Sequence, residues 1–183
     1  MRPLLLNLAV SLDGYIEGPN GEIDWCMTDQ DYGLTAFLDR CDALLMGRKS
    51  YEAMLALGPD PWPEKHKYIL SNTLRDVIPN AEVMAGEVST GVARLKQQPG
   101  KGIWLFGGGE VIAQCLRAGL VDELCVAVHP IILGGGRPLC VDVPRTALDL
   151  LDHTLYDTGL VQLSYRVKAD DRRLNSPAPS LDL

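Results

Sequence analysis

The stretch Ile103-Trp-Leu-Phe-Gly-Gly-Gly-Glu-Val-Ile-Ala-Gln-Cys-Leu116 combines a short apolar run, three consecutive glycines and apolar residues at helical spacing. It predicts a buried strand, a tight turn without side chains, and a helix that begins directly after the turn. The first N–H groups of a helix lack partners inside it and carry the positive end of the helix dipole, which favours a phosphate group. We therefore predict that Gly107, Gly108 and Gly109 bind the pyrophosphate of a nucleotide or dinucleotide.

A second interpretation of the glycine triplet needs no ligand. Glycine is the residue of choice wherever a sharp strand-to-helix connection requires unusual backbone angles. The usual dinucleotide fingerprint is also absent, because Ile112 stands where it has glycine or alanine and the motif comes late in the chain. On this motif alone both interpretations stay open.

Composition restricts the class of protein. The chain has 183 residues, 46% of them hydrophobic and 22% charged, which predicts one globular domain with a substantial core. A formal net charge of −7 argues against a general nucleic-acid or membrane-surface binder, and no apolar run is long enough to span a bilayer. The five cysteines and three histidines show no metal or disulfide spacing, so we expect no metal and a reducing, cytoplasmic location.

Strand and helix patterns alternate along most of the chain. Strands are expected at 3–11, 43–46, 66–70, 81–84, 103–106 and 123–128, and helices at 28–40, 48–57, 89–98 and from 110 onward. Residues 12–21 are expected to form a loop, and 148–157 and 160–167 a closing hairpin. The pattern predicts a mainly parallel α/β sheet with an antiparallel edge hairpin in one domain at 1–167, followed by a disordered tail at 168–183.

Three strand ends carry similar chemistry. Gly47-Arg48-Lys49-Ser50 and Ser71-Asn72 each follow a predicted strand, as the glycine triplet does, and ligands of open α/β sheets gather at the carboxyl ends of strands. Cations at a helix N-terminus oppose the helix dipole, so Arg48 and Lys49 favour an anionic partner over mere solvation. We expect them to hold the extra phosphate that distinguishes NADP(H) from NAD(H).

Several segments together resemble one family. They are Asn7-Leu-Ala-Val-Ser-Leu-Asp-Gly-Tyr-Ile16, Ala43-Leu-Leu-Met-Gly-Arg-Lys-Ser-Tyr-Glu52, Tyr68-Ile-Leu-Ser-Asn72, Leu105-Phe-Gly-Gly-Gly-Glu-Val111 and Val128-His-Pro-Ile-Ile-Leu-Gly-Gly-Gly-Arg-Pro-Leu139. In this order they resemble the dihydrofolate reductase superfamily, and within it the reductase (RibD C-terminal) domain of bifunctional riboflavin-biosynthesis enzymes. The resemblance covers about residues 2–167.

The resemblance implies a three-layer fold with a mostly parallel eight-stranded sheet, and NADPH as cofactor across the strand ends. Ala9 would contact the nicotinamide, the segment after residue 46 the phosphates, and the glycine triplet the diphosphate. The cofactor-binding residues implied are Ala9, Gly47, Arg48, Lys49, Ser50, Ser71, Asn72, Phe106, Gly107, Gly108, Gly109, Glu110, Val111 and Ile112.

The substrate side matches the family less well. Dihydrofolate reductases carry a pterin-binding acid in the first helix after a tryptophan, but simple spacing from Trp25 leads to Gln30, beside Asp31. The riboflavin-type reductases often have a lysine where this chain has Asn7. Candidate substrate residues are Asn7, Trp25 and His129, and the candidate proton donors are Asp13, Asp31 or water.

The sequence therefore predicts an NADPH-dependent reductase of a small heterocycle, resembling 5-amino-6-(5-phosphoribosylamino)uracil reductase. The alternatives are a dihydrofolate or pterin reductase, an NADPH-binding module without its own catalysis, and a structural α/β domain. The apolar hairpin at 148–167 also predicts a homodimer.

Overall fold

The computed structural model describes residues 1–168, so residues 169–183 of the predicted tail lie outside the described part. The helices are α1 (Leu34–Asp39), α2 (Arg48–Ala56), α3 (Val88–Lys96) and α4 (Gly109–Arg117). The strands are β1 (Leu4–Ser11), β2 (Tyr15–Glu17), β3 (Cys41–Gly47), β4 (His66–Leu70), β5 (Ala81–Met84), β6 (Gly102–Gly107), β7 (Glu123–His129), β8 (Arg137–Pro138), β9 (Leu148–Leu155) and β10 (Val161–Val167). None of the helices in this range is long and apolar enough to cross a bilayer.

Eight of the strands form one sheet in the order β5-β4-β3-β6-β1-β7-β10-β9. The first six are parallel, and β10 and β9 add an antiparallel hairpin at one edge. The predicted sheet and its hairpin are thereby confirmed. Central strands such as β1 have apolar residues on both faces because helices cover both sides of a parallel sheet.

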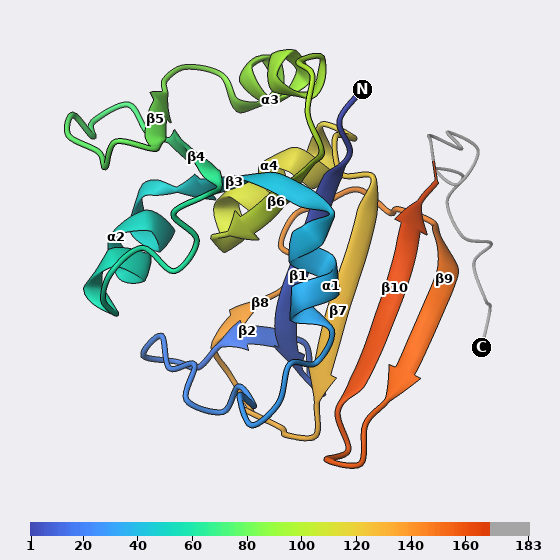
Figure 1. The fold of residues 1–183 in the computed structure, drawn as a ribbon. Helices are drawn as coiled ribbons and strands as arrows, with labels where there is room; N and C mark the ends of the chain where they lie inside the picture. The colour runs from blue at the N-terminus through green and yellow to red at the C-terminus, as the bar shows by residue number, and fades with distance from the viewer. Residues whose placement is uncertain (169–183) are drawn as a thin grey trace.

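The helices form the outer two layers around the sheet. One face packs Leu6, Leu45 and Leu105 against α3 and α4, and the other packs Leu5 and Leu44 against α1 and α2. Figure 1 shows α1 across β1 and β7, whereas the β9–β10 hairpin stands at the side of the sheet without a helix in front of it. Every residue of β9 is exposed to solvent.

The first helix differs from the expected one. Its predicted start at Thr28 is wrong, because Tyr32 and Gly33 have φ values of 47° and 75°, which no right-handed helix can continue through. The helix begins instead at Leu34, where the Asp31 carboxylate accepts a hydrogen bond from the Thr35 N–H at 3.0 Å.

The segment predicted as a loop at 12–21 contains a short strand. Here β2 pairs with β8 in a separate two-stranded sheet, with Tyr15 opposite Pro138 and Glu17 opposite Arg137. The pairing joins segments about 120 residues apart and involves only a few residues, so no local periodicity announces it.

Candidate functional site

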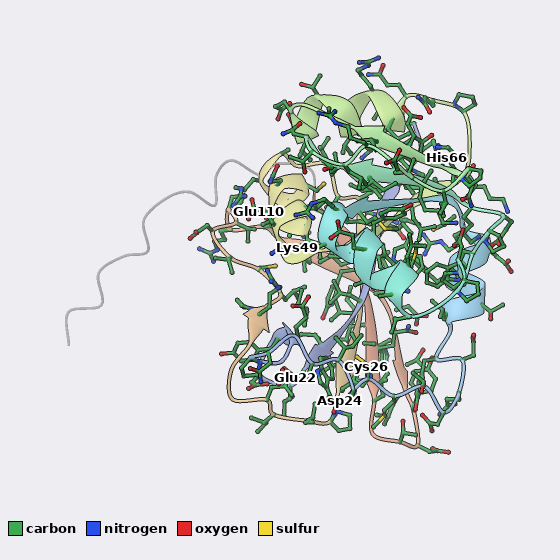
Figure 2. The ribbon with its side chains drawn as sticks, turned by 90° about the vertical axis from the view of Figure 1, so that its left-hand side faces the viewer. Glu22, Asp24, Cys26, Lys49, His66 and Glu110 are labelled. Atoms are coloured by element: carbon green, nitrogen blue, oxygen red, sulfur yellow. The ribbon has the colours of Figure 1, made fainter. Side chains whose placement is uncertain are left out.

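The carboxyl ends of β3 and β6 bring the start of α2 against the glycine triplet. A Cβ atom added to Gly108 would lie 3.2 Å from Ser50 Oγ, and one added to Gly47 would lie 3.1 Å from Val111 Cγ2. The two segments predicted to hold the phosphates therefore meet in space. Figure 2 shows Lys49 and Glu110, from the first turns of α2 and α4, near one another in this region.

The triplet exposes backbone where other residues would place side chains. Gly107 has φ of 138°, in the region that L-residues rarely adopt, and the Gly107–Gly108 peptide is cis. Gly107 is buried, whereas Gly108 and Gly109 are half-buried. A ligand can therefore approach the peptide groups of Gly108 and Gly109 without meeting a side chain of their own.

The two helix starts at this point have no side-chain caps. Gly47 precedes α2 and Gly108 precedes α4, and neither can donate or accept through a side chain. In α3, by contrast, the Glu87 carboxylate accepts hydrogen bonds from Ser89 N at 3.1 Å and Thr90 N at 2.7 Å. The N-termini of α2 and α4 thus retain the donors and the dipole that favour an anion.

Charged side chains surround these helix starts. Arg48 Nη1 lies 2.9 and 3.1 Å from the two Glu52 carboxylate oxygens, and both side chains are about half-exposed. Lys49 is exposed, and the Glu110 carboxylate accepts hydrogen bonds from Gln114 and Arg117. Internal partners therefore already share part of the charge at the site.

Arg137 is a further cation at the glycine triplet that the sequence analysis missed. A Cβ atom on Gly109 would lie 3.1 Å from Arg137 Cδ, so the arginine stem crosses directly over this glycine. Its guanidinium donates to Glu17 Oε2 at 2.9 Å across the β2–β8 pair. The signal in the sequence is the second glycine run, Gly134-Gly-Gly-Arg-Pro138, which follows β7.

Ser71 and Asn72 order the loop after β4. Ser71 Oγ accepts hydrogen bonds from Thr73 N and Leu74 N, which leaves its O–H to donate. Asn72 Oδ1 accepts from Gly86 N at 3.0 Å, which ties this loop to the end of β5. Both residues lie at the same sheet edge as the glycine triplet, two strands further out.

A strip of small and polar residues runs along the α1–α2 face of β1, β7 and β10. Directly paired residues of a sheet point to the same face, and Leu5 places this face toward α1 and α2. We call it the polar strip; it comprises Asn7, Ala9, Ser11, Cys125, Ala127, His129, Gln162 and Ser164. Except for Ser11 and His129, its members are only half-buried, so the helices leave much of it uncovered.

Asp13 and Asp31 hold turns together. Asp13 accepts from Ser11 Oγ at 2.6 Å and Gly134 N at 2.7 Å, and these hydrogen bonds, that of Ser11 foremost, lower its pKa to about 2. Hydrogen bonds from Thr35 lower the pKa of Asp31. Both groups are ionised at neutral pH and have no proton to give, which makes them poor proton donors.

Trp25 and His129 meet at the end of β7. Their ring centroids are 5.2 Å apart at an interplanar angle of 89°, an edge-to-face contact. Trp25 is half-buried and its Nε1 donates to the Glu22 carbonyl at 3.1 Å. Figure 2 shows Glu22, Asp24 and Cys26 along this irregular segment, which precedes α1.

Several proteins resemble this chain in sequence or in structure. YyaP of Bacillus subtilis, itself uncharacterized, is 40% identical over 177 residues that cover 90% of this chain and 94% of that protein. A Shewanella sp. PV-4 protein assigned to riboflavin biosynthesis superimposes with a TM-score of 0.80 at 29% identity, covering 91% of this chain and 99% of its own.

More distant structures extend the fold. The diaminohydroxyphosphoribosylaminopyrimidine deaminase/5-amino-6-(5-phosphoribosylamino)uracil reductase of Thermotoga maritima has a TM-score of 0.69 at 18% identity, covering 91% of this chain and 57% of that one. Dihydrofolate reductase of Enterococcus faecalis, solved with NADP(H), has a TM-score of 0.64 at 17% identity, covering 91% and 97%. The predicted dihydrofolate reductase-like fold is confirmed. Residues 2–162 match the model of the RibD C-terminal domain, and the chain belongs to that family.

Proposed function

We propose that the protein is an NADPH-dependent reductase whose substrate is a small heterocycle of the 5-amino-6-(5-phosphoribosylamino)uracil class. The observation that carries the proposal is the meeting of two uncapped, glycine-led helix starts at Gly47 and Gly108. Such a pair suits a diphosphate. The reductase activity of the Thermotoga maritima protein and the NADP(H) bound to the Enterococcus faecalis enzyme support this proposal.

The proposed cofactor lies across the strand ends, from β4 to β1. Ser50, the glycine triplet and the first turn of α4, Glu110 to Ile112, hold the diphosphate, with Phe106 just before them. Arg48 and Lys49 hold the 2′-phosphate, and Ser71 and Asn72 lie beside the adenosine. The backbone of Ala9, a member of the polar strip, would contact the nicotinamide.

NADPH supplies the hydride, and the protein orients the acceptor and excludes water from it. Because Asp13 and Asp31 are ionised, we propose water as the proton source. The Asn7 side chain of the polar strip offers both a donor and an acceptor to a hydroxylated or aminated ring. Trp62 and Phe106, whose ring centroids are 5.7 Å apart, lie on the same face and add flat apolar surface.

An aminouracil is favoured over a pterin by the position of the first helix. The acid expected in a pterin site follows the tryptophan inside a helix, whereas Asp31 precedes α1 and already accepts hydrogen bonds from Thr35. Its carboxylate is exposed. A pterin would have to displace this cap before it gained the carboxylate.

The direct test is to mix purified protein and NADPH with 5-amino-6-(5-phosphoribosylamino)uracil or dihydrofolate and to follow the absorbance of the reduced nicotinamide. Oxidation with the aminouracil is the expected result. If no acceptor of either class oxidises NADPH, the proposal that the protein is a reductase is rejected. Calorimetric binding of NADPH without turnover would then leave a dinucleotide-binding module, and no binding at all would leave a structural domain.

A second copy of the chain is the proposed partner. The outer edge of β9 pairs with no strand of the described chain, and β9 exposes Leu148, Leu150, Leu151 and Leu155 by 38–73%. An uncovered apolar edge strand favours pairing with an identical edge, and a homodimer would cover it.

The cysteines bear on the proposed cytoplasmic location. All five are free, and desolvation raises the pKa of buried Cys115 to about 12. Free, buried thiols suit a reducing compartment.

A further inference from the structure

His129 holds a polar atom that the protein itself leaves without a partner. Its side chain is almost fully buried, with 3% of the residue exposed at the end of β7. Nε2 has no hydrogen-bond partner and is the one such buried side-chain atom within residues 1–168. Since buried polar atoms are normally paired, an orphan of this kind calls for a partner from outside the chain.

The second ring nitrogen fixes what Nε2 offers. Nδ1 lies 3.0 Å from the Ala127 carbonyl oxygen, which can only accept a hydrogen bond. Nδ1 therefore carries the hydrogen, and in the neutral ring Nε2 presents a lone pair. The group that completes this residue is a donor, such as the exocyclic amine of a heterocycle.

The position of His129 separates it from the proposed cofactor. The residues that would hold the cofactor lie on β3, β6 and, at Ala9, on β1, and β7 is the next strand beyond β1 in the sheet. His129 is paired with Ser11, two residues further along the strand than Ala9 and on the same face. A molecule that touches both the nicotinamide and His129 is therefore the hydride acceptor.

We propose that His129 is a specificity-determining residue, whose Nε2 accepts a hydrogen bond from an exocyclic NH₂ group on the substrate ring. This inference rests on the proposed function and deepens it, because it selects aminated heterocycles over isosteres in which a methyl group replaces the amine. The lone pair finds no partner in a methyl group, and the buried atom stays unsatisfied.

Trp25 packs against the ring that carries this atom. Nε2 has essentially no exposed surface, and the Trp25 ring packs edge-to-face against the histidine. The Trp25 indole also donates to the Glu22 carbonyl at 3.1 Å, within the same irregular segment. A substrate amine that reaches Nε2 must therefore fit beside the indole that packs against the imidazole ring.

The test compares two probes that differ in one group, 6-aminouracil and 6-methyluracil, titrated calorimetrically with NADP⁺ present so that no turnover occurs. The wild-type protein is expected to bind the amino compound more tightly, by about five- to tenfold. His129→Phe keeps the ring against Trp25 but removes the acceptor, and the preference should vanish. His129→Gln restores an acceptor oxygen and should recover part of it. His153→Phe, at an exposed histidine on β9, is the matched control and should keep the full preference.

A measurement on the wild-type protein guards against a variant that does not fold. In a long-range ¹H–¹⁵N spectrum of the histidine rings, the Nε2 resonance of His129 should shift on addition of 6-aminouracil and stay in place with 6-methyluracil. Equal affinities of the wild type for both probes, or a preference that survives in His129→Phe, would overturn the inference. The inference would also be overturned if His129→Phe weakened NADP⁺ binding as much as it weakened 6-aminouracil binding. The nicotinamide carboxamide would then be the donor to Nε2. Failure of the proposed function looks different: NADPH is oxidised by no acceptor while the amino preference persists.

Discussion

Opposite effects on NADPH binding are expected from the two partners of one ion pair in α2. Arg48 donates to both carboxylate oxygens of Glu52, so its positive charge is partly neutralised before any cofactor binds. If Arg48 holds the 2′-phosphate, Arg48→Gln should weaken NADPH binding. Glu52→Gln should strengthen it, because the guanidinium is freed and a negative charge is removed.

The magnitude follows from exposure. Two unit charges about 4 Å apart interact by about 1 kcal/mol in water and about 4 kcal/mol near a protein surface. The Arg48 side chain is 43% exposed, and its charge is already paired with that of Glu52. Both facts favour an interaction energy in the lower part of this range. We expect Arg48→Gln to cost about 1–2 kcal/mol of NADPH binding, or about five- to thirtyfold in Kd. Glu52→Gln should strengthen NADPH binding by about twofold in Kd, which is the scale of an exposed i,i+4 ion pair.

Calorimetric titration with NADPH and NADH measures both affinities in each variant. NADH lacks the 2′-phosphate, so its Kd should change less than about twofold in either variant, by the weakness of exposed charge effects. The NADPH difference should also shrink as salt rises. Arg94→Gln removes an equal charge from the last turn of α3 and serves as the control. Equal losses for NADPH and NADH in Arg48→Gln, or an equal loss in the control, would refute the assignment.

Three further predictions concern stability and assembly. Lys67 is fully buried and donates to Asp60 and to the Trp62 carbonyl, so Lys67→Met should lower the free energy of unfolding by about 3 kcal/mol in urea titrations. The exposed Lys101→Met should change it by less than about 0.5 kcal/mol. Hydrogen bonds from Ser89 and Thr90 lower the pKa of Glu87 from 4.5 to about 2, so its stabilising effect is complete above 4.5 and is lost as pH falls through about 2. An NMR titration of this carboxyl should give that low midpoint, and Glu87→Gln should destabilise the protein at neutral pH but not at pH 2. Leu150→Lys, at a residue 56% exposed on β9, should shift a wild-type dimer to monomer in sedimentation, whereas Asp149→Asn should not; a monomeric wild type would contradict the dimer.

The sheet was predictable because its strands are coded locally. Buried runs such as Leu4–Leu6 and Ala43–Met46 are apolar in sequence, and glycine or polar residues mark where they stop. The convergence of Gly47 and Gly108 followed from the rule that parallel strands share one carboxyl edge. In this part of the molecule, local pattern and topology point to the same site.

The start of α1 was not predictable in the same way. Thr28, Asp29 and Asp31 satisfy the preferences of an N-cap and first turn, yet the chain turns through positive φ at Tyr32 and Gly33. Contacts from the far hairpin hold this turn: Gln162 Nε2 donates to the Tyr32 carbonyl, and the Tyr32 hydroxyl lies 3.1 Å from Thr158 Oγ1. Tertiary contacts outweighed local propensity, and no window of sequence around residue 30 contains them.

Arg137 shows how such a non-local contact reaches the site itself. Gly136 has φ of 131°, and a Cβ atom there would lie 2.0 Å from the Glu17 carbonyl oxygen, so glycine is required for β8 to approach β2. That approach sets the Arg137 stem over Gly109 and pairs its guanidinium with Glu17. The second glycine run therefore acts on the first: it admits a close backbone contact, and the contact delivers a cation to the N-terminus of α4. A bulky residue at 136 would separate β2 from β8 and withdraw Arg137 from the triplet, although Gly107, Gly108 and Gly109 themselves would be unchanged.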